Sequence, residues 1–322
     1  MSQKPESRMP AGVPDPPWRI SAACWLVIVL FHLLRWMPRR WMYGRVSKRL
    51  GLAARHHLKE RVMDHVTQVL GEFESADARE NFWESHVDHL GRCVLEPIDL
   101  SWMPRAEMLE RIEVGGCEIL DEVRSEGRGA VLFLNHLGNP ATVVGALGPR
   151  GYDLAIAGNA INYADSKGMY RLDRLENLIQ RMFRSVDVER VLLGEELPAK
   201  MARVLARNGF FGMFIDFPVE EKHNVALPFG GRLMDAHIGP ALLALRHRVP
   251  VLMVTSHRTG ENRHRLEITR VPLPPPELRL QKAAEELLRS ALGQMLNSVR
   301  QHPDQWWPWD VVRLSPFPSS ES

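Results

Sequence analysis

The sequence predicts an α/β fold in which a mostly parallel central sheet is flanked by helices. From Gly129 onward, apolar runs of strand length alternate with stretches of helical periodicity. The runs lie at 130–134, 153–157, 210–215, 249–254 and 266–271, and the helical stretches near 169–183, 195–208 and 238–247. Such alternation is typical of crossover units, which pair successive strands in parallel.

The chain before these strands is predicted to be helical. Residues 55–70 and 79–95 each place apolar side chains on one helix face. After the last strand, residues 279–299 predict an amphipathic helix. We therefore expect a leader at 1–19, a membrane anchor at 20–37, a helical lead-in at 38–128, the α/β core at 129–312 and a tail at 313–322.

The anchor is predicted from an apolar run at 20–34, which is shorter than the ~17–25 residues of a spanning helix. Extension to Met37, with Arg35 reaching the interface, lengthens it to eighteen. Six basic residues follow the run and three precede it, which places its C-terminal side in the cytoplasm. A cleavable signal peptide is disfavoured because RWMPRR follows the run. A buried helix of a soluble domain remains the alternative.

Composition excludes several classes of protein. The 41 Lys and Arg residues nearly balance 39 Asp and Glu, unlike a dedicated nucleic-acid binder. The three scattered cysteines indicate free thiols in a reducing compartment. His86 and His89 have no third ligand nearby, and we interpret them as part of a solvated helix face rather than a metal site. No cofactor or metal is expected.

Three strand ends carry the candidate site, because ligands of open α/β sheets bind at the carboxyl ends of strands. His136 follows the run at 130–134 directly, and Gly138 allows a close approach of substrate. The alternative is that His136 only hydrogen-bonds the backbone. Asp216 directly follows the run at 210–215 and precedes a Pro/Gly-rich segment. The closing HPDQWWPW, at 302–309, is expected to dock on the body of the protein or on the membrane.

In their order, these segments resemble the late acyltransferases of lipid A biosynthesis (lauroyl/myristoyl type), within the glycerophospholipid acyltransferase superfamily. The resemblance covers roughly residues 20–312. It rests on the anchor, the lead-in, HLGN at 136–139, Asp216, PFGGR at 228–232, GPALLALRHRVPVLMV at 239–254 and HPDQWWPW.

The resemblance implies transfer of a fatty acyl chain from a carrier thioester, on acyl carrier protein or CoA, to a membrane lipid or glycolipid of the lipid A type. It implies the cytoplasmic side of the bacterial inner membrane, with no nucleic-acid partner. His136 would remove the proton of the acceptor hydroxyl. We expect Asp216 to act with it, and we expect substrate contacts from Gly138, Asn139, Arg181, Gly230, Gly231 and Arg232.

Two positions depart from the family pattern. In the family, four residues separate the histidine from an Asp or Glu. At the corresponding position after His136, this chain has Ala141. After the run at 153–157 the family tends to carry an arginine, but this chain reads Gly158-Asn159. Asp216 could supply the missing carboxylate, or Asp235 and His237 could form a relocated pair. The third alternative is a catalytically degenerate protein that binds an acyl donor, a lipid or a partner enzyme.

Overall fold

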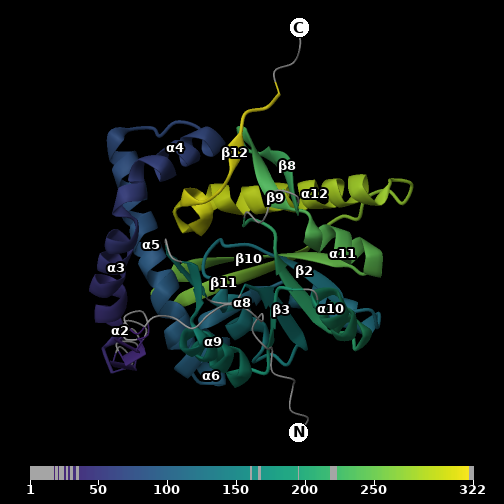
Figure 1. Ribbon diagram of the computed structural model, residues 1–322, viewed down its shortest axis with the longest axis horizontal. Helices are drawn as coiled ribbons and strands as arrows, with labels where there is room; N and C mark the ends of the chain where they lie inside the picture. The colour runs from purple at the N-terminus through teal and green to yellow at the C-terminus, as the bar shows by residue number, and fades with distance from the viewer. Residues whose placement is uncertain are drawn as a thin grey trace.

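A seven-stranded sheet forms the centre of the computed structural model (Figure 1). The structure describes residues 18, 21, 25, 26, 28, 29, 32, 33, 36–159, 162–165, 168–194, 196–217 and 223–318. The sheet strands are β1 (Ile112–Gly115), β2 (Ala130–Leu134), β3 (Leu154–Gly158), β6 (Glu189–Leu192), β7 (Phe210–Phe214), β10 (Val251–Gly260) and β11 (Arg263–Arg270).

The strand order is β1-β11-β10-β2-β7-β3-β6. The strands from β10 to β6 pair in parallel, whereas β11 pairs antiparallel with β10 through a hairpin. β1 then pairs in parallel with β11. The prediction of a mostly parallel α/β sheet is confirmed, and the carboxyl ends of β2 and β7 lie side by side.

Both faces of the sheet are covered by helices, because successive side chains of a strand point to opposite faces. Val131 and Phe133 of β2 join one apolar core, whereas Ala130, Leu132 and Leu134 join the other. The first core contains α10 (Leu197–Ala206), α11 (Gly239–His247) and α12 (Leu280–Gln301). The second contains α6 (Arg105–Arg111), α7 (Cys117–Ser125), α8 (Ala141–Leu147) and α9 (Asp173–Ser185).

The five predicted strands correspond to β2, β3, β7, β10 and β11, but several short elements were missed. The helix predicted at 169–183 begins only at Asp173, because β4 (Asn162–Asp165) and β5 (Gly168–Arg171) form a hairpin before it. A separate small sheet contains β8 (Asn224–Phe229), β9 (Arg232–His237) and β12 (Leu314–Ser315). β1 lies within the segment predicted as helical lead-in and belongs to the main sheet.

The N-terminal helices wrap one side of the sheet (Figure 1). They are α2 (Arg39–Trp41), η1 (Met42–Val46), α3 (Ser47–Arg55), η2 (His56–Leu58), α4 (Lys59–Leu70) and α5 (Ala76–Trp102). Ser75 caps α5 by accepting a hydrogen bond from the Ala78 amide at 3.0 Å. After α12 come η4 (Pro303–Gln305) and η5 (Trp307–Asp310), which pack back onto α5 and α4.

The predicted leader and anchor fall mostly outside the described residues. Among the residues that the structure does describe, no helix is both long enough and apolar enough to cross a membrane. The anchor at 20–37 therefore stays a prediction.

The interpretation of His86 and His89 as a solvated helix face was wrong. Both side chains are buried, because α5 is covered by neighbouring segments on more than one side. His86 Nδ1 lies 2.9 Å from the carbonyl oxygen of Asp304, and His89 contacts Arg258. In the described part of the chain, no three His, Cys, Asp or Glu side chains gather as a metal site requires.

Two glycines set the close packing of α3 against α5. A methyl group at Gly51 would overlap the carbonyl oxygen of Val87, and one at Gly91 would overlap that of Ser47. Both obstacles are backbone atoms, so the helices would have to separate to admit a side chain.

We expect Gly51→Ala and Gly91→Ala each to destabilise the protein by about 1–3 kcal/mol, the usual cost of overpacking. Gly293→Ala is the matched control, because Gly293 is exposed on α12 with open space around it. That change should be neutral or slightly stabilising. Thermal unfolding measures all three, and equal melting temperatures would contradict the packing argument.

Candidate active site

The loop after β2 is held rigidly from its first residue. Asn135 is buried, donates to the carbonyl oxygen of Val254 at 2.9 Å and accepts from the amide of Leu137 at 3.0 Å. Ser256 donates to the carbonyl oxygen of Leu137 at 3.0 Å. Gly138 has φ +64° and lies so close to Ser256 that a Cβ would clash with that residue's backbone. The chain therefore turns sharply and fixes His136 at the sheet edge.

Asp216, at the end of β7, holds His136 by two hydrogen bonds. Its Oδ2 accepts from the His136 amide at 2.7 Å, and its Oδ1 lies 2.8 Å from His136 Nδ1. Trp306 Nε1 also donates to Oδ2, at 2.9 Å. The carboxylate is completely buried, whereas the His136 side chain is 14% exposed. Three N–H donors thus converge on a carboxylate that has no contact with water.

Aromatic rings enclose the imidazole of His136. The ring of Phe214 stacks on it at a centroid distance of 4.4 Å, and the rings of Trp307 and Phe217 lie at 5.0 and 5.5 Å. The Trp307 amide donates to the carbonyl oxygen of His136 at 3.1 Å. Trp306 and Trp309 are fully buried, so the prediction that the closing tryptophans dock on the body of the protein is confirmed.

This geometry suits a general base. With a carboxylate accepting at Nδ1, that nitrogen carries the proton of the neutral ring, and Nε2 keeps its lone pair. The same carboxylate stabilises the imidazolium that forms when Nε2 takes a proton. His136 can therefore accept a proton from a bound hydroxyl.

An apolar cavity of about 460 Å³ opens beside His136. Its volume falls in the range of small-molecule sites. Helix α5 contributes one wall, the start of α8 a second and the α9 side a third. The lining includes Leu90, Val94, Ala141, Val144, Ile156, Gly158, Met182, Phe183 and Phe214. Ala141, where the family carries an acid, thus adds a methyl group to an apolar wall.

A family model described as bacterial lipid A biosynthesis acyltransferase matches residues 18–309. The chain belongs to this family. The match covers most of the chain. No curated protein matches the sequence.

The predicted substrate contacts fall in different places in the structure. Gly138 and Asn139 lie in the His136 loop, and buried Asn139 lines the apolar cavity and donates to Glu96 at 2.8 Å. Arg181 is exposed on α9 and is not part of the cavity lining, although Ile179 and Met182 are.

Gly230, Gly231 and Arg232 are not brought to His136. Gly230 turns the β8–β9 hairpin with φ +62° against the backbone of Val69, and the Gly231 amide donates to the Val69 carbonyl oxygen at 3.0 Å. Arg232 donates to Gln68 at 3.0 Å. The segment therefore packs the small sheet onto the end of α4.

The relocated pair does not reach the cavity either. The Asp235 amide donates to the Arg313 carbonyl oxygen, and the His237 amide donates to that of Ile215. Neither side chain lines the apolar cavity. Burial, together with the nearby His223, lowers the pKa of His237 to about 4. Of the two carboxylates considered, Asp216 is the one that contacts His136.

Arg190 is a candidate that sequence reasoning missed. It lies on β6 opposite Ile156 of β3, lines the cavity and is almost buried. Its guanidinium pairs with Glu176 and donates to the carbonyl oxygen of Asn159 at 2.7 Å. A cation from the adjacent strand thus lies beside Gly158-Asn159, where the resemblance led us to expect an arginine. Only strand pairing reveals this, because the two positions lie far apart in sequence.

We expect Asp216→Asn to lower kcat by about 10⁴-fold, the loss that follows neutralisation of the orienting aspartate in serine proteases. The NH2 group of the new asparagine would face an N–H donor in place of an acceptor oxygen. The orientation of the His136 ring would be disturbed, and the protein would be less stable to unfolding. Acyl-transfer kinetics and thermal unfolding separate the two effects. Asp235→Asn is the control and should keep wild-type kcat. Wild-type turnover in Asp216→Asn would contradict the assignment.

Proposed function

We propose that the protein transfers a fatty acyl chain from a carrier thioester, on acyl carrier protein or CoA, to a hydroxyl of a membrane lipid or glycolipid. We further propose that it does so at the cytoplasmic face of a bacterial inner membrane. The observation that carries the proposal is the His136–Asp216 pair at the mouth of an apolar cavity. The cavity would hold the acyl chain, and the pair would activate the acceptor.

The reaction follows from this geometry. Nε2 of His136 removes the proton of the acceptor hydroxyl as its oxygen attacks the thioester carbonyl carbon. The tetrahedral intermediate collapses, the carbon–sulfur bond breaks, and the imidazolium returns its proton to the leaving thiolate. Asp216 stabilises the imidazolium during this sequence, since its Oδ1 stays 2.8 Å from Nδ1. The products are an ester and a free carrier thiol.

The contacts of Asp216 favour an enzyme over a degenerate acyl-binding protein. A protein that only binds acyl groups requires an apolar cavity, but it does not require a buried carboxylate oriented by three N–H donors. Such a carboxylate is costly to bury unless its hydrogen bonds serve a purpose. The degenerate alternative nevertheless makes a distinct prediction, namely binding without turnover.

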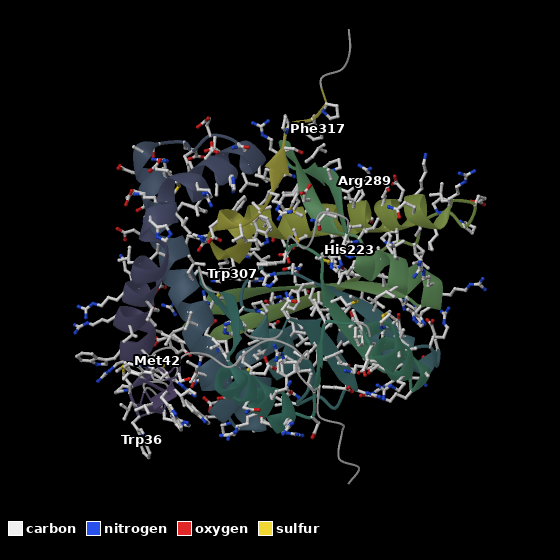
Figure 2. All side chains as sticks on the ribbon, in the orientation of Figure 1. Trp36, Met42, His223, Arg289, Trp307 and Phe317 are labelled. Carbon is white, nitrogen blue, oxygen red and sulfur yellow. The ribbon has the colours of Figure 1, made fainter. Side chains whose placement is uncertain are left out.

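Exposed apolar side chains near the N-terminus support membrane association. Trp18, Trp25, Leu33, Trp36 and Trp41 are among the large apolar residues that face solvent, and Trp36 is 82% exposed. Trp36 lies at the outer edge of the molecule, near Met42 (Figure 2). Tryptophans favour the headgroup region of a bilayer, and the exposed Arg40 beside them suits anionic lipids.

We expect His136→Ala to reduce acyl transfer by about 10²–10⁴-fold, the usual contribution of a general base. Protein in detergent is given labelled acyl carrier protein thioester, or acyl-CoA, with a pool of lipid acceptors. Binding of the donor is measured in parallel. Binding without transfer in both wild type and variant would establish the degenerate alternative.

We expect Gly158→Met to shift the preferred acyl chain toward shorter lengths. Gly158 lines the cavity, and the position where its Cβ would lie has no atom within 4 Å, so the methionine can extend into the cavity without backbone strain. Competition between acyl donors of different lengths measures the preference. Gly293→Met, on an exposed part of α12, is the control. An unchanged preference in Gly158→Met would place the acyl chain elsewhere.

A further inference from the structure

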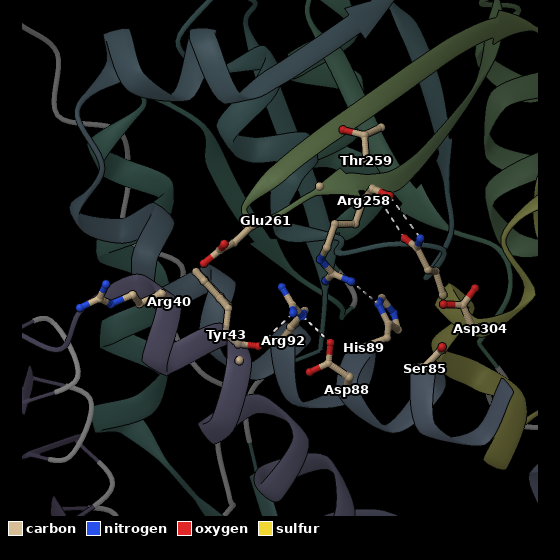
Figure 3. A pocket seen from close by; sticks show the side chains of 13 residues that line it. Arg40, Tyr43, Ser85, Asp88, His89, Arg92, Arg258, Thr259, Glu261 and Asp304 are labelled. Atoms are coloured by element: carbon tan, nitrogen blue, oxygen red, sulfur yellow. Dashed lines mark hydrogen bonds and ion pairs between the residues drawn. The ribbon is translucent and has the colours of Figure 1, made fainter. Parts of the chain in front are cut away.

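A second cavity of about 460 Å³ lies against another face of α5, and its lining is polar (Figure 3). Asp88, His89 and Arg92 of α5 face it, whereas Leu90, Cys93 and Val94 of the same helix face the apolar cavity. Arg258, from β10, extends across the polar cavity toward His89 (Figure 3). Its side chain is only 10% exposed.

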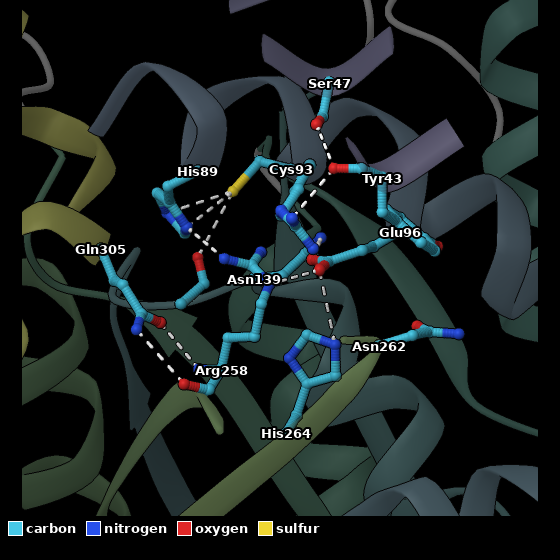
Figure 4. A network of polar contacts seen from close by, with 12 residues as sticks. Tyr43, Ser47, His89, Cys93, Glu96, Asn139, Arg258, Asn262, His264 and Gln305 are labelled. Carbon is cyan, nitrogen blue, oxygen red and sulfur yellow. Dashed lines mark hydrogen bonds and ion pairs between the residues drawn. The ribbon is translucent and has the colours of Figure 1, made fainter. Parts of the chain in front are cut away.

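A first chain of contacts joins Arg258 to the loop of His136 through Glu96. Arg258 Nε donates to Glu96 Oε1 at 2.7 Å, and Asn139 Nδ2 donates to Glu96 Oε2 at 2.8 Å (Figure 4). Glu96 is fully buried. Burial acts to raise the pKa of this carboxyl, but the charge of Arg258, the nearby His264 and the hydrogen bonds from Arg258 and Asn139 together outweigh it and hold the pKa below its ordinary value. Glu96 therefore stays an acceptor for both residues.

A second chain runs through His89 and Cys93. Arg258 Nη1 lies 3.1 Å from His89 Nδ1, and because a guanidinium only donates, Nδ1 must accept. Burial, reinforced by Arg258, lowers the pKa of His89, so the ring is neutral and its proton sits on Nε2. Nε2 lies 3.3 Å from Cys93 Sγ, and the thiol lies 3.5 Å from the Gly138 carbonyl oxygen, to which it donates. Burial raises the pKa of this thiol to about 12, so it keeps its proton.

A third chain uses the backbone of Arg258. Its amide donates to Gln305 Oε1 at 2.7 Å, and its carbonyl oxygen accepts from Gln305 Nε2 at 3.3 Å. The Gln305 carbonyl oxygen in turn accepts from the Gly138 amide at 2.9 Å. Gln305 directly precedes Trp306, which donates to Asp216. Of the three chains, this one survives truncation of the side chain.

We propose that Arg258 is a positioning residue for acyl transfer, which holds the loop of His136 in its active geometry through Glu96 and His89. The inference rests on the proposed function. Arg258 acts on the Asn139 side chain through Glu96 and on the Gly138 carbonyl through His89 and Cys93. Gly138 and Asn139 are the second and third residues after His136. A shift of the loop by a fraction of an ångström moves Nε2 relative to the thioester, and misplacement by 1 Å costs about 10²-fold.

The substitution that tests this is Arg258→Lys, which keeps a positive charge. One ammonium on a flexible chain cannot reproduce the planar fork that serves Glu96 and His89 together. We expect kcat to fall by about 10²-fold with KM nearly unchanged, because neither cavity loses a group that the acyl chain contacts. Arg92→Ala is the matched control, since Arg92 lines the same polar cavity but bonds Asp88 and the Tyr43 carbonyl oxygen. It should keep wild-type kcat.

Arg258→Ala adds chemical rescue. Arg258 Nη2 is buried with no hydrogen-bond partner among the described residues, and the side chain borders the polar cavity, so guanidinium ion can reach the space that the truncation leaves. Millimolar guanidinium should restore part of kcat, whereas equal urea should not, because urea lacks the charge that pairs with Glu96. If Arg258 mattered only for folding, neither guanidinium nor urea would restore kcat in Arg258→Ala.

Hydrogen exchange gives a readout that does not depend on turnover. The Ala141 amide donates to Asn139 Oδ1 at 3.0 Å, and Glu96 orients that side chain, so this amide should exchange faster in Arg258→Lys than in wild type, while amides of β7 keep their protection. Wild-type kcat in Arg258→Lys would overturn the inference, as would a loss in Arg258→Ala that guanidinium leaves unchanged. If Arg258→Ala does not fold, Glu96→Gln takes its place and should lower kcat at constant KM. Absence of transfer in wild type would instead remove the proposed function.

Discussion

A single buried carboxylate, that of Asp216, joins three parts of the chain that are distant in sequence. It accepts from the amide and the ring of His136 after β2, and from the indole of Trp306 near the end of the chain. A buried carboxylate without these donors would be strongly destabilising. The sheet edge, the loop of His136 and the closing segment are therefore fixed together. Loss of any one donor weakens the positions of the other two.

The location of this carboxylate also explains how Ala141 can be tolerated. The acid is supplied by the neighbouring strand β7, whose end lies beside that of β2 in the parallel sheet. Ala141 is then free to contribute to the apolar wall of the cavity. An acid at that position would bring a charge into a cavity lined largely by hydrocarbon, and the imidazole nitrogen that it would serve is already occupied.

Helix α5 separates two cavities of unlike character. It presents Cys93 and Val94 to one and Asp88 and Arg92 to the other. Its buried Glu96 pairs with Arg258, an arrangement that is seldom favourable for stability alone. The desolvation of both charges is offset by hydrogen bonds that continue to Asn139 and His89. The pair therefore contributes more to fixing the geometry of the His136 loop than to the stability of α5.

Much of this arrangement could be predicted from residue patterns, and the rest depended on contacts between distant segments. The run at 130–134 is buried on both faces and matches β2 in full, and the strand-end rule brought His136 and Asp216 to one edge. β6 and β9 were missed because charged residues interrupt their apolar positions. His86 and His89 were misjudged because the periodicity of a helix does not show which of its side chains a distant segment covers. Arg190 was missed because its place beside β3 follows from strand pairing, and Arg258 because its contacts are with Glu96 and His89 of α5, far away in sequence.

The docking of the closing segment has a consequence for the order of events in biosynthesis. Trp306 lies ninety residues after Asp216, and the segment around it supplies the Gln305 and Trp307 contacts that brace the catalytic loop. A nascent chain can form the strands of the sheet before these residues have left the ribosome, but the part of the cavity wall that Trp307 supplies must wait for them. The bracing of the His136 loop is then completed last. If the protein transfers acyl groups as proposed, a chain released before this segment would lack the geometry that the reaction requires.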